Sequence, residues 1–189
     1  MITDGQTIQD SDEDLVLRLC KGENLALDVL MQRYQEPLYH FVLRYIHDNH
    51  LAYDIMQETF VRVYTRATSF NPEFRFKTWL YQIALNLCRD RGRKNVLRRF
   101  FSFDEAEEKE SIFTGYDAGI EDKKDTKDDI ALLQKEIAKL PHKLKSALIL
   151  FSLEEKSQIE SAEILGVSPK TIETRVYRAK KILEKKMNQ

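Results

Sequence analysis

Aromatic rings and positive charges alternate in a short stretch of the sequence between residues 70 and 77. Rings stack on unpaired bases and cationic side chains hold phosphates, so this mixture is typical of a surface that binds single-stranded nucleic acid. Phe70 and Phe76 fit a hydrophobic core equally well, and the sequence leaves that choice open. We assign the binding role to Phe74, Arg75 and Lys77.

A pair of expected helices flanks this stretch and has one polar face and one basic end. Before it, a mostly polar stripe recurs at helical spacing and comprises Asp54, Gln57, Glu58, Val61 and Thr65. The stripe has no obvious partner within the chain, which predicts that it binds another protein. The second helix ends in a basic run, and we expect contacts to DNA from Arg89, Arg93 and Lys94.

The end of the chain has the signals of a helix-turn-helix unit. A helix is expected from Ser157 to Leu165, followed by the turn Gly166-Val167-Ser168 and a final helix from Pro169. Ser168 is a favourable N-cap and Pro169 a favourable first helical residue. One side of the final helix is suited to phosphates and base edges in a major groove. We assign to this DNA surface Ser168, Lys170, Thr171, Thr174, Arg175, Arg178 and Lys181. The alternative is an ordinary amphipathic helix whose basic end complements its dipole.

The elements that position these residues are all expected to be helices, because helix formers dominate and apolar residues recur at helical spacing. Ser11 opens the first helix and Gly22 ends it. The next helix has a continuous apolar stripe from Leu27 to Tyr45, with Pro37 expected to kink or split it. The helices on either side of the 70–77 stretch have their own core stripes: Met56, Phe60, Val63 and Ala67, then Trp79, Leu80, Ile83, Ala84, Leu87 and Cys88.

Charge divides the chain into alternating segments. Acidic residues outnumber basic ones in residues 1–29 and 104–129, and the balance reverses in residues 30–103 and 130–189. Residues 104–129 have no apolar periodicity, so we expect them to form a flexible acidic linker. We therefore expect two small helical domains, residues 1–103 and 130–189, that hold each other only weakly. In the second domain, helical order is expected from Ile130, and Phe151 is expected to face inward.

Several classes of protein are disfavoured by what the sequence lacks. It has no run of apolar residues long enough for a membrane span and no signal peptide, and isolated Cys20 and Cys88 suit a reducing cytoplasm. His47 and His50 have a spacing that could hold zinc, but we interpret them as part of a polar turn between helices. No nucleophile and base motif and no glycine-rich phosphate loop is present, so neither an enzyme nor a cofactor is expected.

Residues 54–93 resemble conserved region 2 of bacterial RNA polymerase sigma factors, most closely those of the extracytoplasmic-function (ECF) group. The resemblance rests on Asp54-Ile55-x-Gln57-Glu58-Thr59-Phe60-x-x-x-Tyr64, Phe76-x-Thr78-Trp79-Leu80-Tyr81-x-Ile83-Ala84-x-Asn86 and Asp90-x-x-Arg93. The C-terminal block is similar to sigma region 4, through Leu140-Pro141 and Arg175-Val176-Tyr177-Arg178-Ala179. It departs at Ser161, where the family often has an apolar residue, so we expect looser packing of that helix.

The resemblance implies a sigma subunit that brings core RNA polymerase to promoters and helps to open them. The polar stripe would then meet the clamp helices of the β′ subunit, and the C-terminal domain would meet the β flap. The 70–77 stretch and the basic run would contact the −10 element, both double-stranded and melted, and the final helix would contact the −35 element. An anti-sigma factor is implied as a further partner.

Two other interpretations remain open. A stand-alone helix-turn-helix regulator with an N-terminal sensing or dimerisation domain needs only the C-terminal block and leaves the polar stripe and the basic run without a role. A helical adaptor protein leaves both basic blocks unexplained. The dependence of promoter binding on core polymerase separates the three.

Overall fold

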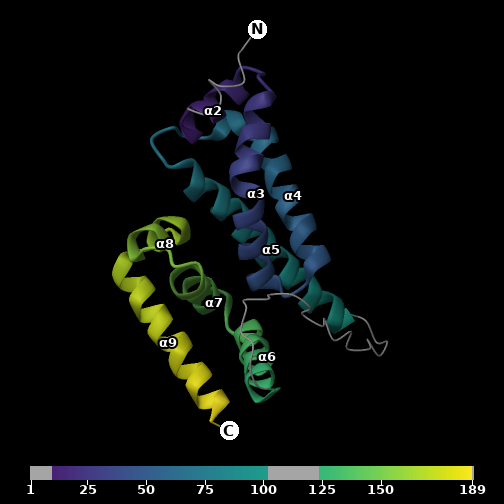
Figure 1. The fold of residues 1–189 in the computed structure, drawn as a ribbon, viewed down its shortest axis with the longest axis vertical. Helices are drawn as coiled ribbons and strands as arrows, with labels where there is room; N and C mark the ends of the chain where they lie inside the picture. Colours follow the sequence, from purple (N-terminus) through teal and green to yellow (C-terminus); the bar gives the residue numbers. More distant parts are fainter. Residues whose placement is uncertain (1–9, 102–123, 189) are drawn as a thin grey trace.

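The computed structural model describes residues 10–101 and 124–188, with side chains over 10–94 and 129–188, and in that part of the chain every regular element is a helix. This confirms the all-α prediction. The first half contains α2 (Asp12–Cys20), α3 (Leu25–Ile46), α4 (Asn49–Thr65), the 3-10 turn η1 (Ala67–Ser69) and α5 (Phe76–Phe101). The second half contains α6 (Lys124–Lys139), α7 (His142–Leu148), the π-helical turn η2 (Ile149–Leu153), α8 (Gln158–Leu165) and α9 (Pro169–Met187) (Figure 1).

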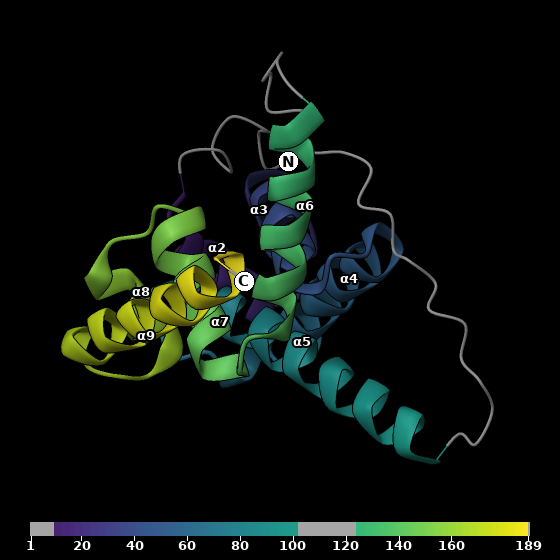
Figure 2. The same cartoon turned by 90° about the horizontal axis from the view of Figure 1, so that it is seen from below.

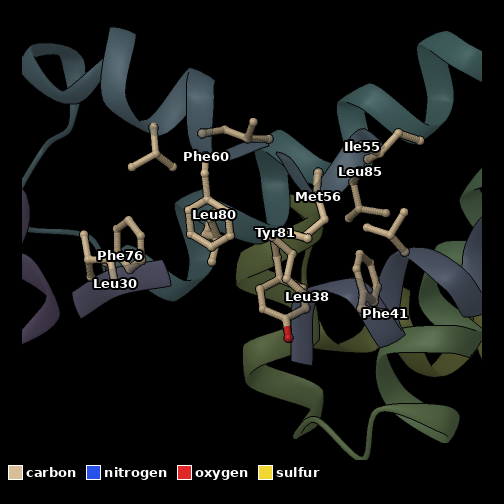
Figure 3. Close-up of a cluster of buried hydrophobic side chains, with 14 of the residues drawn as sticks. Leu30, Leu38, Phe41, Ile55, Met56, Phe60, Phe76, Leu80, Tyr81 and Leu85 are labelled. Atoms are coloured by element: carbon tan, nitrogen blue, oxygen red, sulfur yellow. The ribbon is translucent and has the colours of Figure 1, made fainter. Parts of the chain in front are cut away.

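The core of the first half lies where α3, α4 and α5 meet. Side chains from the three helices interdigitate there, among them Phe41, Phe60 and Leu80, which are almost fully buried (Figure 3). The first predicted stripe is confirmed, because Met56, Phe60 and Val63 of α4 and Ala67 of η1 are all buried. On α5 the prediction was incomplete, because Tyr81 and Leu85 are also buried. Two different faces of α5 are therefore covered.

Pro37 does not split the helix that contains it. α3 runs continuously from Leu25 to Ile46 with Pro37 in its interior. Proline removes one backbone hydrogen bond and crowds the preceding turn. Pro37 itself is exposed, while Leu38 and Phe41, on the buried face, are fully covered. The core contacts of the helix are therefore intact on both sides of the proline.

The helix-turn-helix unit forms as predicted. Ser157 caps α8 in a capping box, in which its hydroxyl accepts from Glu160 N–H and the Glu160 carboxylate accepts from Ser157 N–H, both at 3.1 Å. Gly166 ends α8 with a φ of 61°, a left-handed conformation that glycine adopts without steric cost. Ser168 then caps α9, and Pro169 is its first residue. Each boundary is set by residues within one turn of it.

Two expectations in the second half are wrong. Helical order begins at Lys124 rather than Ile130. The sequence did not indicate this start, because the first turns of α6 are polar and carry no apolar periodicity. Residues 104–123 of the expected linker lie outside the described residues. Phe151 is exposed rather than inward, since the π-helical turn shifts the register and turns Ile149 and Leu150 toward the core instead.

The two halves pack directly against each other, which the sequence analysis missed. Ile149, Leu150 and Ile164 from the second half belong to the same buried cluster as the core of the first. The Lys156 ammonium lies 4.3 Å from the centre of the Tyr81 ring, a cation–π contact across the interface. Figure 2 shows α8 and α9 on one side of α6 and the end of α5 projecting away on the other.

Buried polar groups add to this interface. Arg44 of α3 pairs with Glu154, which follows η2, and the Tyr45 hydroxyl contacts Nδ1 of His142 at the start of α7. The Lys145 ammonium lies 4.7 Å from the centre of the Tyr45 ring, and burial lowers the pKa of Lys145 to about 8. The lowered pKa means that the charged form of Lys145 is less favourable in the folded protein than in the unfolded chain.

Replacing Ser161 by alanine should stabilise the protein. Ser161 is fully buried in α8, and its hydroxyl has no hydrogen-bond partner among the described residues. Removing an unsatisfied buried hydroxyl should raise the free energy of unfolding by about 1 kcal/mol, measured by urea denaturation. Ser157→Ala, which removes the α8 cap, is the matched control and should lower it by about 1 kcal/mol. A loss of stability in Ser161→Ala would mean that the hydroxyl is satisfied by water.

Candidate functional site

The polar stripe on α4 faces away from the core. Asp54, Glu58 and Val61 are exposed, and Gln57 is half-buried. The stripe does have partners, but they lie on α4 itself. The Glu58 carboxylate accepts from Arg62 Nε at 2.9 Å, and the Gln57 amide donates to the Tyr53 hydroxyl at 3.1 Å. No element of the described chain needs this face for packing, and the 53% exposure of Val61 leaves an apolar side chain uncovered within it.

Two residues of the stripe, Asp54 and Glu58, line an open groove between α4 and α5. The α4 wall contains Leu51, Asp54, Ile55, Glu58 and Arg62, and the α5 wall contains Leu87, Asp90, Arg91, Arg93 and Lys94. The structure therefore brings two of the expected protein-binding residues, Asp54 and Glu58, together with two of the expected DNA-binding cations, Arg93 and Lys94. The sequence analysis missed Leu51, Arg62 and Leu87. The spacing of Arg62 four residues after Glu58 was the available signal for its ion pair.

The loop between η1 and α5 presents a single aromatic ring to solvent. Phe74 is 63% exposed and Arg75 is also exposed, whereas Phe70 and Phe76 are buried. Trp79 packs against both buried rings, with centroid distances of 5.2 Å to Phe70 and 6.2 Å to Phe76. The choice left open for Phe70 and Phe76 is thus settled in favour of the core. The exposed loop offers one ring, Phe74, beside the cations Arg75 and Lys77.

The cations of α5 differ in how far they are engaged. Lys77 Nζ lies 3.5 Å from a carboxylate oxygen of Glu160 on α8. Hydrogen bonds from Ser157 hold the pKa of Glu160 below its usual value, and Lys77 contributes to the same shift. Arg93 pairs with Asp90 at 2.9 Å but is 65% exposed. Arg89 and Lys94 are exposed, so the basic end of α5 stays accessible while Lys77 is partly covered by the second half.

The outward face of α9 carries most of the residues predicted for DNA binding. Ser168, Lys170, Thr174, Arg178 and Lys181 are exposed, and Thr171 and Arg175 are half-buried. Ser168 and Thr174 are engaged in the helix: the Ser168 hydroxyl accepts from Thr171 N–H, and Thr174 donates to the Lys170 carbonyl. The sequence analysis missed Tyr177, which is 66% exposed and lies on this face. Its position three residues after Thr174 and four before Lys181 was the available signal.

Cations from both halves act on His142, at the start of α7. Burial lowers the pKa of His142, and positive charges on Arg89, Lys145, Arg175 and Arg93 lower it further. Arg89 and Arg93 belong to α5 and Arg175 belongs to α9. The basic end of α5 and the outward face of α9 therefore act on one imidazole, although they are far apart in the sequence.

The described residues contain neither a membrane-spanning helix nor a cluster of metal-ligating side chains. None of the helices there is long and apolar enough to cross a membrane. The same residues contain no group of three or more histidine, cysteine, aspartate or glutamate side chains placed to hold a metal ion.

Comparison with known families gives two matches in chain order. Residues 30–98 match Sigma-70 region 2, which covers most of α3, all of α4 and most of α5. Residues 130–183 match Sigma-70, region 4, which covers the second half from α6 to most of α9. Each match thus contains one of the expected DNA surfaces, and the first contains the whole α4–α5 groove.

Curated relatives match over nearly their full length. The chain is 30% identical over 187 residues to the RNA polymerase sigma-H factor of Pseudomonas aeruginosa, covering 94% of each protein. It is 32% identical over 173 residues to the ECF RNA polymerase sigma factor SigW of Bacillus subtilis, covering 88% of this chain and 91% of SigW. Among solved structures, the fold is similar to CnrH, solved in complex with the cytosolic domain of CnrY, with a TM-score of 0.67, 24% identity and coverage of 95% of this chain and 98% of CnrH.

Proposed function

Because this chain belongs to the ECF group of the sigma-70 family of RNA polymerase sigma factors, we propose that it binds core polymerase through the α4–α5 groove and promoter DNA through two separate surfaces. The observation that carries the proposal is the polar stripe of α4. Its residues Asp54, Glu58 and Val61 are exposed and are not needed for packing, and Asp54 and Glu58 line a groove that also contains the apolar side chains of Leu51, Ile55 and Leu87. Such a mixture of charge and uncovered apolar surface is what a protein partner requires. The partner is assigned to the clamp helices of β′, with Gln57 at the edge of the contact.

Two DNA surfaces divide the promoter between them. For the −10 element and its melted strand we assign Phe74, Arg75, Lys77, Arg89, Arg93 and Lys94. Phe74 supplies the ring for an unpaired base and the cations hold the backbone. For the −35 element we assign Ser168, Lys170, Thr171, Thr174, Arg175, Arg178 and Lys181. These residues lie along one helix that is preceded by a glycine turn and a capped start, the arrangement that places a recognition helix in the major groove.

The domain division proposed from the sequence is kept with one change. Residues 1–103 form the domain for polymerase and the −10 element, and residues 130–189 form the domain for the −35 element and the β flap, extended at its start to Lys124 by α6. An acidic segment joins them. The proposed activity consists of binding and positioning in the cytoplasm, and it requires neither a catalytic group nor a cofactor.

Control by an anti-sigma factor is part of the proposal. Support comes from the similarity of fold to CnrH, which was solved in complex with the cytosolic domain of CnrY. The packing of the two halves also places Glu160 against Lys77, which is one of the residues assigned to the −10 element. A partner that holds the two halves together would therefore keep Lys77 from contacting DNA.

A gel-shift experiment tests the proposed function against a stand-alone regulator. A promoter fragment is taken from a gene whose transcript rises when the chain is overexpressed. The chain alone should shift this fragment weakly, and the chain with core polymerase should shift it strongly and start transcription from it. Strong binding by the chain alone that core polymerase does not change would support the stand-alone helix-turn-helix regulator instead.

A further inference from the structure

We propose that Glu13, at the start of α2, is a positioning residue for promoter melting, because its carboxylate holds the first turn of α5 and so fixes the exposed loop that contains Phe74 and Arg75. The inference rests on the proposed function of this loop. It concerns an element outside residues 30–98, the part of the chain that matches Sigma-70 region 2.

The contact joins two elements that are far apart in the sequence. The backbone N–H of Phe76 donates to Glu13 Oε1 at 2.8 Å, and Phe76 is the first residue of α5. The first N–H groups of a helix have no acceptor within the helix. A carboxylate at this position satisfies one of them and is favoured by the positive end of the helix dipole. Glu13 thus does for α5 what an N-cap side chain does in other helices.

α2 is itself firmly attached to the bundle, so the contact has a rigid base. The neighbouring carboxylate of Asp12 accepts from Arg33 Nη1 at 2.7 Å and also contacts the Tyr34 hydroxyl, both on α3. Leu15 and Val16 are fully buried beneath it. Two adjacent carboxylates of α2 therefore connect α3 to the start of α5.

The ring of Tyr34, on α3, also contacts Phe76 at the start of α5. It packs edge-on against the ring of Phe76, with centroids 5.4 Å apart. Burial and the hydrogen bond to Asp12 raise the pKa of Tyr34, so its hydroxyl remains a donor across the physiological range. Both the backbone and the side chain of Phe76 are consequently held by groups outside α5.

The position of Phe76 determines where the loop residues lie. Phe74 and Arg75 immediately precede Phe76, and Lys77 follows it. The other end of the loop is closed by a turn in which Phe74 N–H donates to the Asn71 carbonyl at 3.0 Å. With one end closed by its own turn and the other held by Glu13, the exposed ring and the cations are ordered before an unpaired base arrives. Pre-ordering lowers the entropy lost on binding.

The test compares variants of full-length chain assembled with core polymerase. Glu13→Ala removes the acceptor, and Glu13→Gln keeps an oxygen that can accept from Phe76 N–H. Asp14→Asn is the matched control, since Asp14 is exposed on the same helix and its carboxylate contacts Ser11, not α5. Three quantities are measured: affinity for core polymerase, affinity of the holoenzyme for the single non-template strand of the −10 region, and permanganate reactivity of unpaired thymines in the promoter.

We expect Glu13→Ala to weaken single-strand binding and promoter opening by about tenfold, the size of effect that losing a helix cap produces. Its affinity for core polymerase should stay within about twofold of the unmodified chain, because the groove is formed by other residues of α4 and α5. Glu13→Gln should recover most of the loss, and Asp14→Asn should behave like the unmodified chain.

Two outcomes would overturn the inference. If Glu13→Ala matches Asp14→Asn in single-strand binding, Glu13 does not position the loop. If Glu13→Ala loses polymerase affinity and single-strand affinity to the same extent, the contact only supports the fold. Phe74→Ala distinguishes failure of the inference about Glu13 from failure of the function proposed for the loop. If Phe74→Ala weakens single-strand binding while Glu13→Ala does not, only the inference about Glu13 fails. If Phe74→Ala has no effect either, the function proposed for the loop is wrong.

Discussion

Replacing Asp54 and Glu58 together by lysine should abolish binding to core RNA polymerase while the protein stays folded. Both side chains are exposed on the same face of α4 and line the groove opposite Arg93 and Lys94. The double substitution removes both acidic side chains of the α4 wall and adds two cations to a groove that already contains Arg62, Arg91, Arg93 and Lys94. The ion pair lost from the fold, Glu58 with Arg62, lies at the surface, where such pairs contribute about 0–1 kcal/mol. Affinity is measured by titration of labelled chain with core polymerase.

The control for this experiment is a charge reversal of the same size elsewhere. Asp28 and Glu36 are exposed on α3 and do not line the groove. Asp28→Lys with Glu36→Lys should therefore leave polymerase binding unchanged. Circular dichroism and the melting temperature, Tm, are followed for both double variants. Unfolding of the Asp54 and Glu58 variant would make the stripe structural, and retained binding would move the polymerase contact to another face.

Replacing Arg178 by alanine should reduce discrimination at one or two positions of the −35 element. Arg178 is exposed on the recognition face of α9, and a bidentate arginine contact to a base is worth about 1–3 kcal/mol. Lys181, nearer the end of the helix, is assigned to the phosphate backbone, so Lys181→Ala should weaken binding to every promoter variant alike and lessen its dependence on salt. Transcription and affinity are compared across single-base variants of the element.

Arg175 provides a useful contrast with Arg178. It is half-buried, and its charge acts on His142 between the two halves. If Arg175 reads a base, Arg175→Ala should also lose discrimination at particular positions. Equal losses on all promoter variants, for either arginine, would reassign that residue to the backbone.

Features governed by neighbouring residues were predictable from the sequence. The cap at Ser168, the turn at Gly166 and the buried stripe of α4 each depend on residues within one or two helical turns. The face that carries Asp54 and Glu58 was predictable for the same reason, since helical spacing places it opposite the stripe that contains Phe60. For these features, local conformational preference and apolar periodicity lead to the same structure.

Features governed by contacts between distant segments were not predictable. Phe70 and Phe76 are core residues because Trp79 and Tyr34 enclose them, and no local pattern distinguishes them from exposed Phe74. Ile149 and Leu150 turn inward only because a π-helical turn precedes α8. The groove shared by α4 and α5, and the contact of Glu13 with Phe76, both require knowing which helices are neighbours.

The shared groove has a thermodynamic consequence. Asp54 and Glu58, assigned to polymerase, and Arg93 and Lys94, assigned to DNA, line the same groove. A partner seated there would alter the surroundings of the cations at the opposite wall, so the two binding equilibria are linked. Linkage is reciprocal. If core polymerase increases the affinity of this surface for promoter DNA by a given factor, promoter DNA must increase the affinity of the subunit for polymerase by the same factor. When polymerase leaves the promoter, this added affinity is lost, and the subunit would then dissociate from polymerase more readily.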